Sequence, residues 1–237
     1  MDDAVLNQLS NEMKLSLLNT LAEDTCDTFA IRASTQRGVF LGSYLNSANR
    51  ERLRVVVKIL GGKIVNQYEE QVTHIITTTD ENNYCRRTLK YILGLSHGCW
   101  ILSAAFLRNC IKEKRYVNEE DFEVSCCQVV GGKLKPPYSI PRYSRENYNK
   151  KTNLFSRFTF KVDKRITVPP PSYLEIMIQN QGGMLYTDQN NRTELKGNYY
   201  FVSDDLPRQR HCRVVPPRWI IDCICYQKIR PLSKYFH

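Results

Sequence analysis

The dipeptide Gly61-Gly62 is followed 38 residues later by Trp100, and the dipeptide Gly182-Gly183 is followed 36 residues later by Trp219. Each glycine pair closes a stretch whose apolar residues recur with helical spacing. This repetition predicts two copies of one small α/β module. A duplicated module that carries no set of catalytic residues is usually a binding device, because the surface shared by two copies can hold a ligand.

The residues around Gly61-Gly62 alternate between strand and helix patterns. Thr73-His74-Ile75-Ile76 is rich in β-branched residues, which is typical of a strand covered on both faces. Asp80 can cap a helix that reaches to about Leu95, and Trp100 is expected to open the last helix. Strands that alternate with helices predict a parallel sheet. The elements expected in the first copy are strands at 39–43, 63–68 and 72–77 and helices at about 47–60, 80–95 and 101–113.

The second copy repeats this order after a connecting segment. Prolines and scattered polar residues in that segment predict an extended linker. Near the start of the chain, apolar residues spaced three or four apart from Asp2 to Asp24 predict an amphipathic helix. The elements expected in the second copy are strands at 158–162 and 199–202 and helices at 172–181 and 219–226. The predicted segments are a lead-in at 1–36, a first repeat at 37–124, a basic linker at 125–156 and a second repeat at 157–237.

Composition predicts a folded chain without a membrane anchor. Hydrophobic residues make up 42% of the 237, enough for packed cores. The longest apolar runs fall well short of the roughly 20 residues that a membrane span requires. The acidic start, Met1-Asp2-Asp3, does not resemble a secretion signal, so the nine cysteines are expected to stay reduced. Their spacing lacks the paired C-x-x-C pattern of a zinc site. We therefore expect no metal, no cofactor and no membrane partner.

Positive charge is concentrated between the two copies. The formal net charge is +10, and the segment from Gly132 to Arg165 holds ten lysines and arginines against Glu146 and Asp163, a local excess of +8. Such a segment attracts polyanions, for example nucleic acid or poly-ADP-ribose, through long-range and salt-sensitive attraction. The alternative is a solvated connector without a ligand.

Taken together, the glycine pair after the first helix, the Thr-His-Ile-Ile strand and the late tryptophan resemble the BRCT (breast cancer C-terminal) repeat. Within that family, the stretch Arg87-Thr88-Leu89-Lys90-Tyr91 resembles the corresponding stretch in the BRCT region of a RING-type ubiquitin ligase. Leu41-Gly42-Ser43 and Gly98-Cys99-Trp100 are more similar to the RING-domain partner of that ligase, to which the whole chain is slightly closer. The resemblance implies two tandem repeats, each a four-stranded parallel sheet flanked by three helices, packed head to tail.

The resemblance also implies a function. BRCT tandems of this kind are nuclear, non-catalytic scaffolds that bind phosphorylated protein motifs. This one is expected to recruit a DNA-damage-response ubiquitin-ligase complex to chromatin, with a RING heterodimer partner bound through regions outside this chain. The expected partner is therefore a phosphorylated protein or a nucleosome.

The resemblance places a phosphate pocket on the first repeat. Ser43 lies at the end of the first strand, where its hydroxyl and the backbone N–H of Tyr44 can both donate to a phosphate oxygen. Lys90 supplies a full positive charge, and Thr88 is a secondary candidate. Open parallel sheets bind ligands at the carboxyl ends of their strands and at helix N-termini, which agrees with this placement. The alternative is that Ser43 is a turn residue and Lys90 a solvated surface lysine.

A second pocket, between the repeats, is implied for the side chain three residues after the phosphoserine. Arg87 matches the arginine that holds the peptide backbone, and the pocket wall falls at Ile92, Pro169 and Ile221. Ile92 and Val168-Pro169 replace an aromatic residue and an Asn-Met pair of the family pattern, which leaves a preference for phenylalanine open. Ile92 and Ile221 are equally well explained as core residues.

Two further functions fit the same residues. The chain can instead read a nucleosome or poly-ADP-ribose through its linker and through Arg208, Arg210, Arg213 and Arg218, or it can be a dimerisation module. His211-Cys212 with Arg218 has the spacing of a cysteine phosphatase, but Pro216-Pro217 lack the N–H groups that such a loop needs. No catalytic residue is therefore expected.

Overall fold

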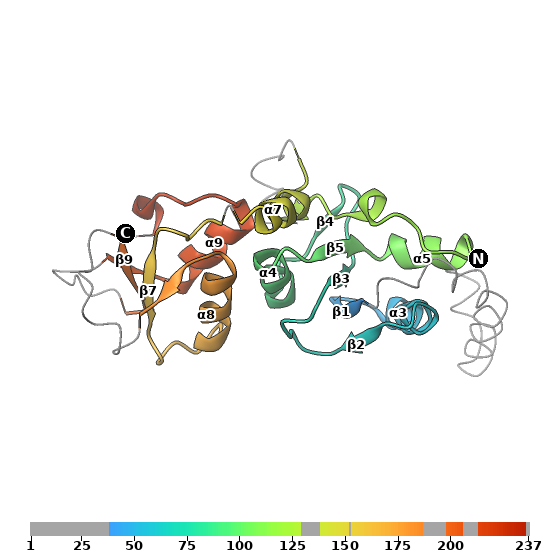
Figure 1. The fold of residues 1–237 in the computed structure, drawn as a ribbon, viewed down its shortest axis with the longest axis horizontal. Helices are drawn as coiled ribbons and strands as arrows, with labels where there is room; N and C mark the ends of the chain where they lie inside the picture. The colour runs from blue at the N-terminus through green and yellow to red at the C-terminus, as the bar shows by residue number, and fades with distance from the viewer. Residues whose placement is uncertain (1–37, 129–137, 152, 187–197, 206–212, 236–237) are drawn as a thin grey trace. The chain divides into compact units, whose positions relative to one another are not determined.

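The computed structural model describes residues 38–128, 138–151, 153–186, 198–205 and 213–235, which form two compact units (Figure 1). The first unit holds the described residues up to Arg86 together with Trp100–Val124. The second unit holds Arg87–Cys99 and the described residues from Ser125 onward. Each unit is therefore built from two separate pieces of chain.

The first unit contains a parallel sheet with the strand order β2-β1-β3-β5. The register aligns the last residues of β1, β3 and β5, which are Ser43, Thr77 and Ser103. Asn46 begins the first helix, because its side chain accepts a hydrogen bond from the N–H of Asn49 at 2.9 Å. The elements of this unit are β1 (Val39–Ser43), α3 (Ser47–Ile59), β2 (Lys63–Val65), β3 (His74–Thr77), β4 (Tyr84–Cys85), β5 (Trp100–Ser103), α5 (Ala105–Lys112) and the 3-10 helix η2 (Glu119–Phe122).

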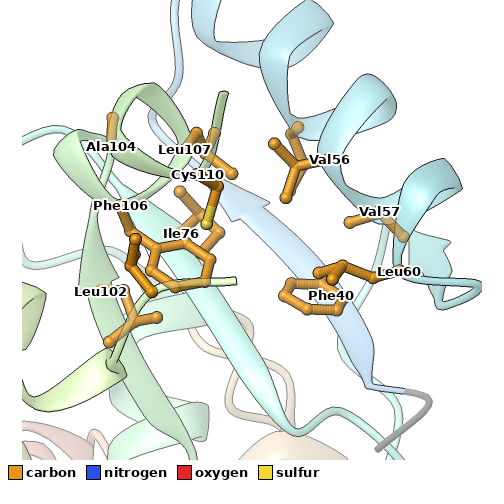
Figure 2. Close-up of a cluster of buried hydrophobic side chains, with 12 residues drawn as sticks. Phe40, Val56, Val57, Leu60, Ile76, Leu102, Ala104, Phe106, Leu107 and Cys110 are labelled. Atoms are coloured by element: carbon orange, nitrogen blue, oxygen red, sulfur yellow. The ribbon is translucent and has the colours of Figure 1, made fainter. Parts of the chain in front are cut away.

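One face of this sheet packs against α3 and α5 to form the core of the first unit (Figure 2). Phe40, Ile76 and Leu102 project from the strands into this core. The helices meet them with apolar side chains at helical spacing: Val56 and Val57 from α3, Leu60 just after it, and Phe106, Leu107 and Cys110 from α5. The helical apolar spacing before Gly61-Gly62 thus corresponds to the face of α3 that packs into this core.

The two glycine pairs perform the same two tasks in both units. Gly61 and Gly182 end α3 and α8 (Pro171–Asn180) with φ of +64° and +76°, a left-handed conformation that favours glycine. Gly62 and Gly183 are needed because there is no space for a side chain. A Cβ at Gly62 would lie 2.7 Å from the Gly38 carbonyl oxygen, and one at Gly183 would lie 2.6 Å from Ile178 Cγ2.

The second unit repeats the parallel sheet, in the order β10-β9-β7-β8. Trp219 is completely buried, stacks on Tyr200 with ring centroids 5.3 Å apart, and donates from Nε1 to the Arg230 carbonyl at 2.9 Å. The remaining elements of this unit are α4 (Leu89–Ser96), β6 (Cys126–Cys127), α7 (Ile140–Asn149), β7 (Thr159–Val162), β8 (Met184–Leu185), β9 (Tyr199–Val202), β10 (Arg213–Val215), α9 (Pro217–Tyr226) and the 3-10 helix η4 (Leu232–Lys234).

The helix α4 belongs to the second unit although its sequence lies inside the first predicted repeat. It packs against α7, α8 and α9. Polar contacts fix its C-terminal end: Ser144 Oγ donates to the Leu95 carbonyl at 2.7 Å, and Gln181 Nε2 donates to the Ser96 carbonyl at 2.6 Å. A helix predicted within one repeat is thus covered by the second unit.

Two predictions for the first repeat are wrong. Trp100 lies in strand β5, where it pairs with His74, and the last helix begins only at Ala105. Its indole is partly buried and packs against the core of the first unit. Asp80 caps a turn instead of a helix, because its carboxylate accepts the N–H groups of Asn82 and Tyr84. The helix begins at Leu89, with Thr88 as its N-cap.

The segment 125–156, predicted to be an extended linker, contains helix α7. The side chain of Ser139 caps this helix, and Pro141 lies in its first turn, where a missing N–H costs nothing. Ile140 and Ser144 are buried, and Tyr148 packs on Gly98. The predicted N-terminal helix, Arg208, Arg210, His211 and Cys212 all lie outside the described residues.

Candidate phosphate-binding site

Three hydroxyl residues line up at the carboxyl edge of the first sheet. Ser43, Thr77 and Ser103 end neighbouring strands in register, so their side chains share one face. All three are buried, and Thr77 Oγ1 has no hydrogen-bond partner among the described residues. A buried hydroxyl is expected to be hydrogen-bonded, and this edge is where parallel sheets bind ligands. The geometry therefore fits the predicted role of Ser43.

Tyr44 follows Ser43 in an unusual conformation. Its φ is +54°, which is uncommon for a residue other than glycine, and its side chain is 60% exposed. Thr78 Oγ1 donates to the Tyr44 carbonyl at 3.0 Å and holds this turn in place. The guanidinium carbon of Arg86 lies 4.7 Å from the centre of the Tyr44 ring. The backbone N–H predicted to bind phosphate thus belongs to a fixed turn.

Thr88 and Lys90 lie at the start of α4. Thr88 is the N-cap, because its Oγ1 accepts from the Tyr91 N–H at 3.1 Å. This corrects the predicted position of Thr88 in the middle of a longer helix. Lys90 lies in the first turn, half-buried, and burial lowers the pKa of its ammonium group. The N-terminus of a helix favours anions, and a lysine there adds a full charge.

Arg87 forms an ion pair with α9. Its Nη1 donates to Asp222 Oδ1 at 2.7 Å, and 22% of its side chain is exposed. The second carboxylate oxygen accepts from the Tyr235 hydroxyl at 2.8 Å, and Arg218 Nε lies 3.6 Å away from it. The contact predicted between Arg87 and a peptide backbone therefore stays a prediction. In that contact, Arg87 Nη1 would have to be shared between Asp222 and the peptide.

The predicted pocket-wall residues all lie in the second unit. Ile92 on α4 is buried, and Ile221 on α9 is partly buried. Pro169 is buried after a cis peptide bond, whereas the preceding Val168 is 81% exposed. Ser43 and Tyr44 belong to the first unit, and Thr88 and Lys90 to the second. Their assembly into one pocket therefore remains a prediction.

Asp222 and Arg86 make contacts that the sequence did not predict. Asp222 is a single acidic residue within the apolar helix α9, a signal that could have marked it as a buried ion-pair partner. Arg86 precedes the predicted ligand Arg87 and contacts Tyr44, but nothing in the local sequence connects it to that ring.

The cysteines and the potential metal ligands of the described part of the chain bear on the sequence-based expectations. The seven cysteines there are buried, and burial raises the pKa of both Cys99 and Cys223 to about 12, so neither thiol is a ready nucleophile. The described residues contain no group of three potential metal ligands. Among the described helices, none is both long and apolar enough to cross a bilayer.

Numbered along the chain, the strands of both sheets are arranged in the order 2-1-3-4, and the first helix of each sheet ends at a glycine pair. These features define a duplicated parallel α/β module. The family model for the BRCA1 C Terminus (BRCT) domain matches residues 35–111, and a second model, for the BRCT domain, matches residues 153–236. The chain belongs to the BRCT family, and the predicted fold class is confirmed.

Two kinds of relative match the chain, breast cancer type 1 susceptibility proteins and BRCA1-associated RING domain proteins. The mouse breast cancer type 1 susceptibility protein homolog is 30% identical over 178 residues, which are 70% of this chain and 9% of the relative. Human BRCA1-associated RING domain protein 1 is 24% identical over 211 residues, 82% of this chain and 26% of the relative. The first is more identical and the second matches more of the chain. The chain spans far less than half the length of either.

Solved structures with the same fold are also BRCT tandems. The BRCT5-BRCT6 domains of S. pombe Brc1 match with a TM-score of 0.54 and 14% identity, over 82% of this chain and 94% of that one. Rtt107p, solved in a complex with a phosphorylated histone, matches with a TM-score of 0.52 and 14% identity, over 90% of this chain and 96% of that one. At these identities the similarity shows the fold alone.

Proposed function

We propose that this tandem BRCT chain binds a phosphorylated side chain of a protein partner through Ser43, the Tyr44 N–H and Lys90, with Thr88 as a further donor. The observation that supports this most is the edge where Ser43 lies, a row of buried hydroxyls beside a fixed turn. Thr88, the N-cap of α4, and Lys90, in its first turn, add a hydroxyl and a positive charge, both of which suit a phosphate.

We further propose a role for this chain in the nucleus. The relatives named after breast cancer type 1 susceptibility and after a BRCA1-associated RING domain suggest a nuclear scaffold that brings a DNA-damage ubiquitin-ligase complex to chromatin. The RING partner would bind outside this chain. The chain itself would contribute the phosphate recognition, without catalysis.

A polyanion reader is the second candidate, and the basic surface favours it. Lys150, Lys151 and Arg157 are exposed and lie close together in sequence, in a chain of net charge +10. Other basic residues that follow are already paired, since Lys164 contacts Glu175 and Arg165 contacts Asp163. These ion pairs reduce the charge available to a polyanion such as a nucleosome or poly-ADP-ribose.

An oriented phosphoserine peptide library, followed by titration of the best peptide and its unphosphorylated twin, tests the proposal. A shaped phosphate site should keep its preference for the phosphorylated peptide as salt rises, whereas polyanion binding should weaken steeply and without sequence preference. Equal affinity for the two peptides would overturn the proposal.

A further inference from the structure

The side chains of Tyr44 and Arg86 form a pair on the surface of the first unit. The guanidinium carbon of Arg86 lies 4.7 Å from the centre of the Tyr44 ring, and both side chains are exposed. Within the described ranges, Arg86 makes no ion pair with a carboxylate. Its charge is thus oriented by an aromatic ring and remains uncompensated by an acidic neighbour.

Beside this ring contact, the N–H groups of the Arg86 guanidinium have no carboxylate partner among the described residues. The N–H donors of a guanidinium lie in one plane. That planar set of donors matches the two oxygens of a carboxylate. Arg86 can therefore bind a carboxylate through two parallel hydrogen bonds.

The conformation of Tyr44 places this pair beside the proposed phosphate ligand. Tyr44 directly follows Ser43 and has a φ of +54°, a value at which glycine would be favoured. Backbone outliers of this kind concentrate at ligand sites. The Thr78 hydroxyl holds the Tyr44 carbonyl at 3.0 Å, so the turn that carries the ring is fixed. A tyrosine thus occupies a position whose backbone conformation favours glycine.

We infer that Tyr44 and Arg86 form a second recognition site, which selects a carboxylate side chain near the phosphorylated residue of the same peptide. The inference rests on the proposed function and adds a specificity to it. Tyr44 orients the guanidinium, and Arg86 binds the acidic side chain. The preferred ligand is therefore a phosphopeptide with glutamate or aspartate close to the phosphate.

The test uses the full chain and the best phosphoserine peptide from a library, with a single glutamate or glutamine moved through each flanking position. The natural chain should prefer glutamate at one position by about three- to tenfold. Arg86→Gln should abolish this preference and keep the preference for phosphate. Arg86→Lys should retain part of it, because the charge stays and the planar edge is lost. Arg108→Gln, at an exposed arginine of α5, is the matched control and should change nothing.

Variants of Tyr44 separate the ring from the backbone. Tyr44→Phe should keep the glutamate preference, and Tyr44→Gly should weaken it without loss of stability in urea. An unchanged glutamate preference in Arg86→Gln, with phosphate still preferred, would overturn the inference and leave the proposed function standing. If the natural chain bound the phosphorylated and unphosphorylated peptides equally well, both the inference and the proposed function would be overturned.

Discussion

Arg87 and Asp222 lie 135 positions apart in the sequence and meet through a 2.7 Å hydrogen bond from Nη1 to Oδ1. Asp222 is 8% exposed and also accepts from the Tyr235 hydroxyl. The contact ties the segment before α4 to α9 within the second unit. A residue expected to hold a peptide is therefore also part of the internal structure of the protein.

Replacing either member of this pair should destabilise the protein. Asp222→Ala is expected to lower the free energy of unfolding by about 2–4 kcal/mol, because it leaves Arg87 without its partner. A double-mutant cycle with Arg87→Ala in urea should give a coupling of about 0.5–3 kcal/mol. Arg218→Ala is the control: this side chain is 70% exposed and 3.6 Å from the carboxylate, so the change should stay below about 1 kcal/mol. Additive effects of the first two variants would contradict the prediction.

Trp219 should matter more for stability than Trp100. Trp219→Ala removes a fully buried indole and should cost about 3–5 kcal/mol in urea unfolding. Trp219→Phe should cost less, since it keeps a ring but loses the hydrogen bond to the Arg230 carbonyl. Trp100→Ala should be milder than Trp219→Ala because Trp100 is only partly buried. Equal losses at both positions would contradict this order.

The two glycines of a pair should fail for different reasons. Gly61→Ala forces a left-handed backbone on alanine and should cost about 1–2 kcal/mol, although there is nothing within 4 Å of the added Cβ. Gly61→Asn should restore part of that loss, since asparagine tolerates this conformation. Gly62→Ala places a Cβ 2.7 Å from the Gly38 carbonyl and should cost about 1–3 kcal/mol, and Gly62→Asn should be worse still. The opposite responses to asparagine are read from urea midpoints.

Alkaline pH should weaken the fold through buried thiols. Burial raises the pKa of Cys110 to about 11 and that of Cys99 and Cys223 to about 12, above the value of about 8.5 for an exposed thiol. Between these two pKa values, the native state keeps the thiol protons that the unfolded chain releases. Stability is therefore complete below about pH 8.5 and falls as pH rises towards the folded pKa values, by up to about 1.4 kcal/mol per pH unit for each thiol. Urea midpoints between about pH 7.5 and 10, a range that spans the thiol pKa of the unfolded chain, check this, and Cys110→Ala should reduce the slope.

Lys90 should dominate phosphopeptide affinity. Lys90→Met removes a charge-assisted contact of roughly 1.5–3 kcal/mol and should weaken the best phosphopeptide about tenfold or more, with the fold intact. Ser43→Ala should weaken it less. Lys58→Met, at an exposed lysine in the last turn of α3, is the control. If Lys150 and Lys151 matter more than Lys90, the polyanion function replaces the proposed one.

The duplicated fold is predictable because its constraints are local. A glycine with positive φ, followed by one packed against backbone or side chain, leaves the same signature in both copies. The error at Trp100 arose because a short run of apolar residues fits a strand and a helix equally well. Helix α7 was missed because Pro141 resembles a breaker, although proline is tolerated in the first turn of a helix.

In the candidate site, too, local features were predictable from the sequence and contacts between distant residues were not. The place of Ser43 at a strand end was predicted from an apolar run followed by turn residues, and Ser43 does end β1. Its role towards phosphate came from the family resemblance and stays a prediction. The position of Thr88 was wrong because the helix start depends on which of two capping residues, Asp80 or Thr88, is used. The partner of Arg87 lies on α9, and no local pattern connects positions so far apart in sequence.

The packing of α4 against α7, α8 and α9 has a consequence for truncated forms of the protein. A premature stop codon in the connecting segment would preserve every residue of the first predicted repeat, yet leave Tyr91 and Leu95, which are completely buried in the intact chain, without the helices that cover α4. Such a fragment would expose an apolar helix to chaperones and proteases. Nonsense variants are therefore expected to remove the whole chain from the cell, not only its C-terminal half.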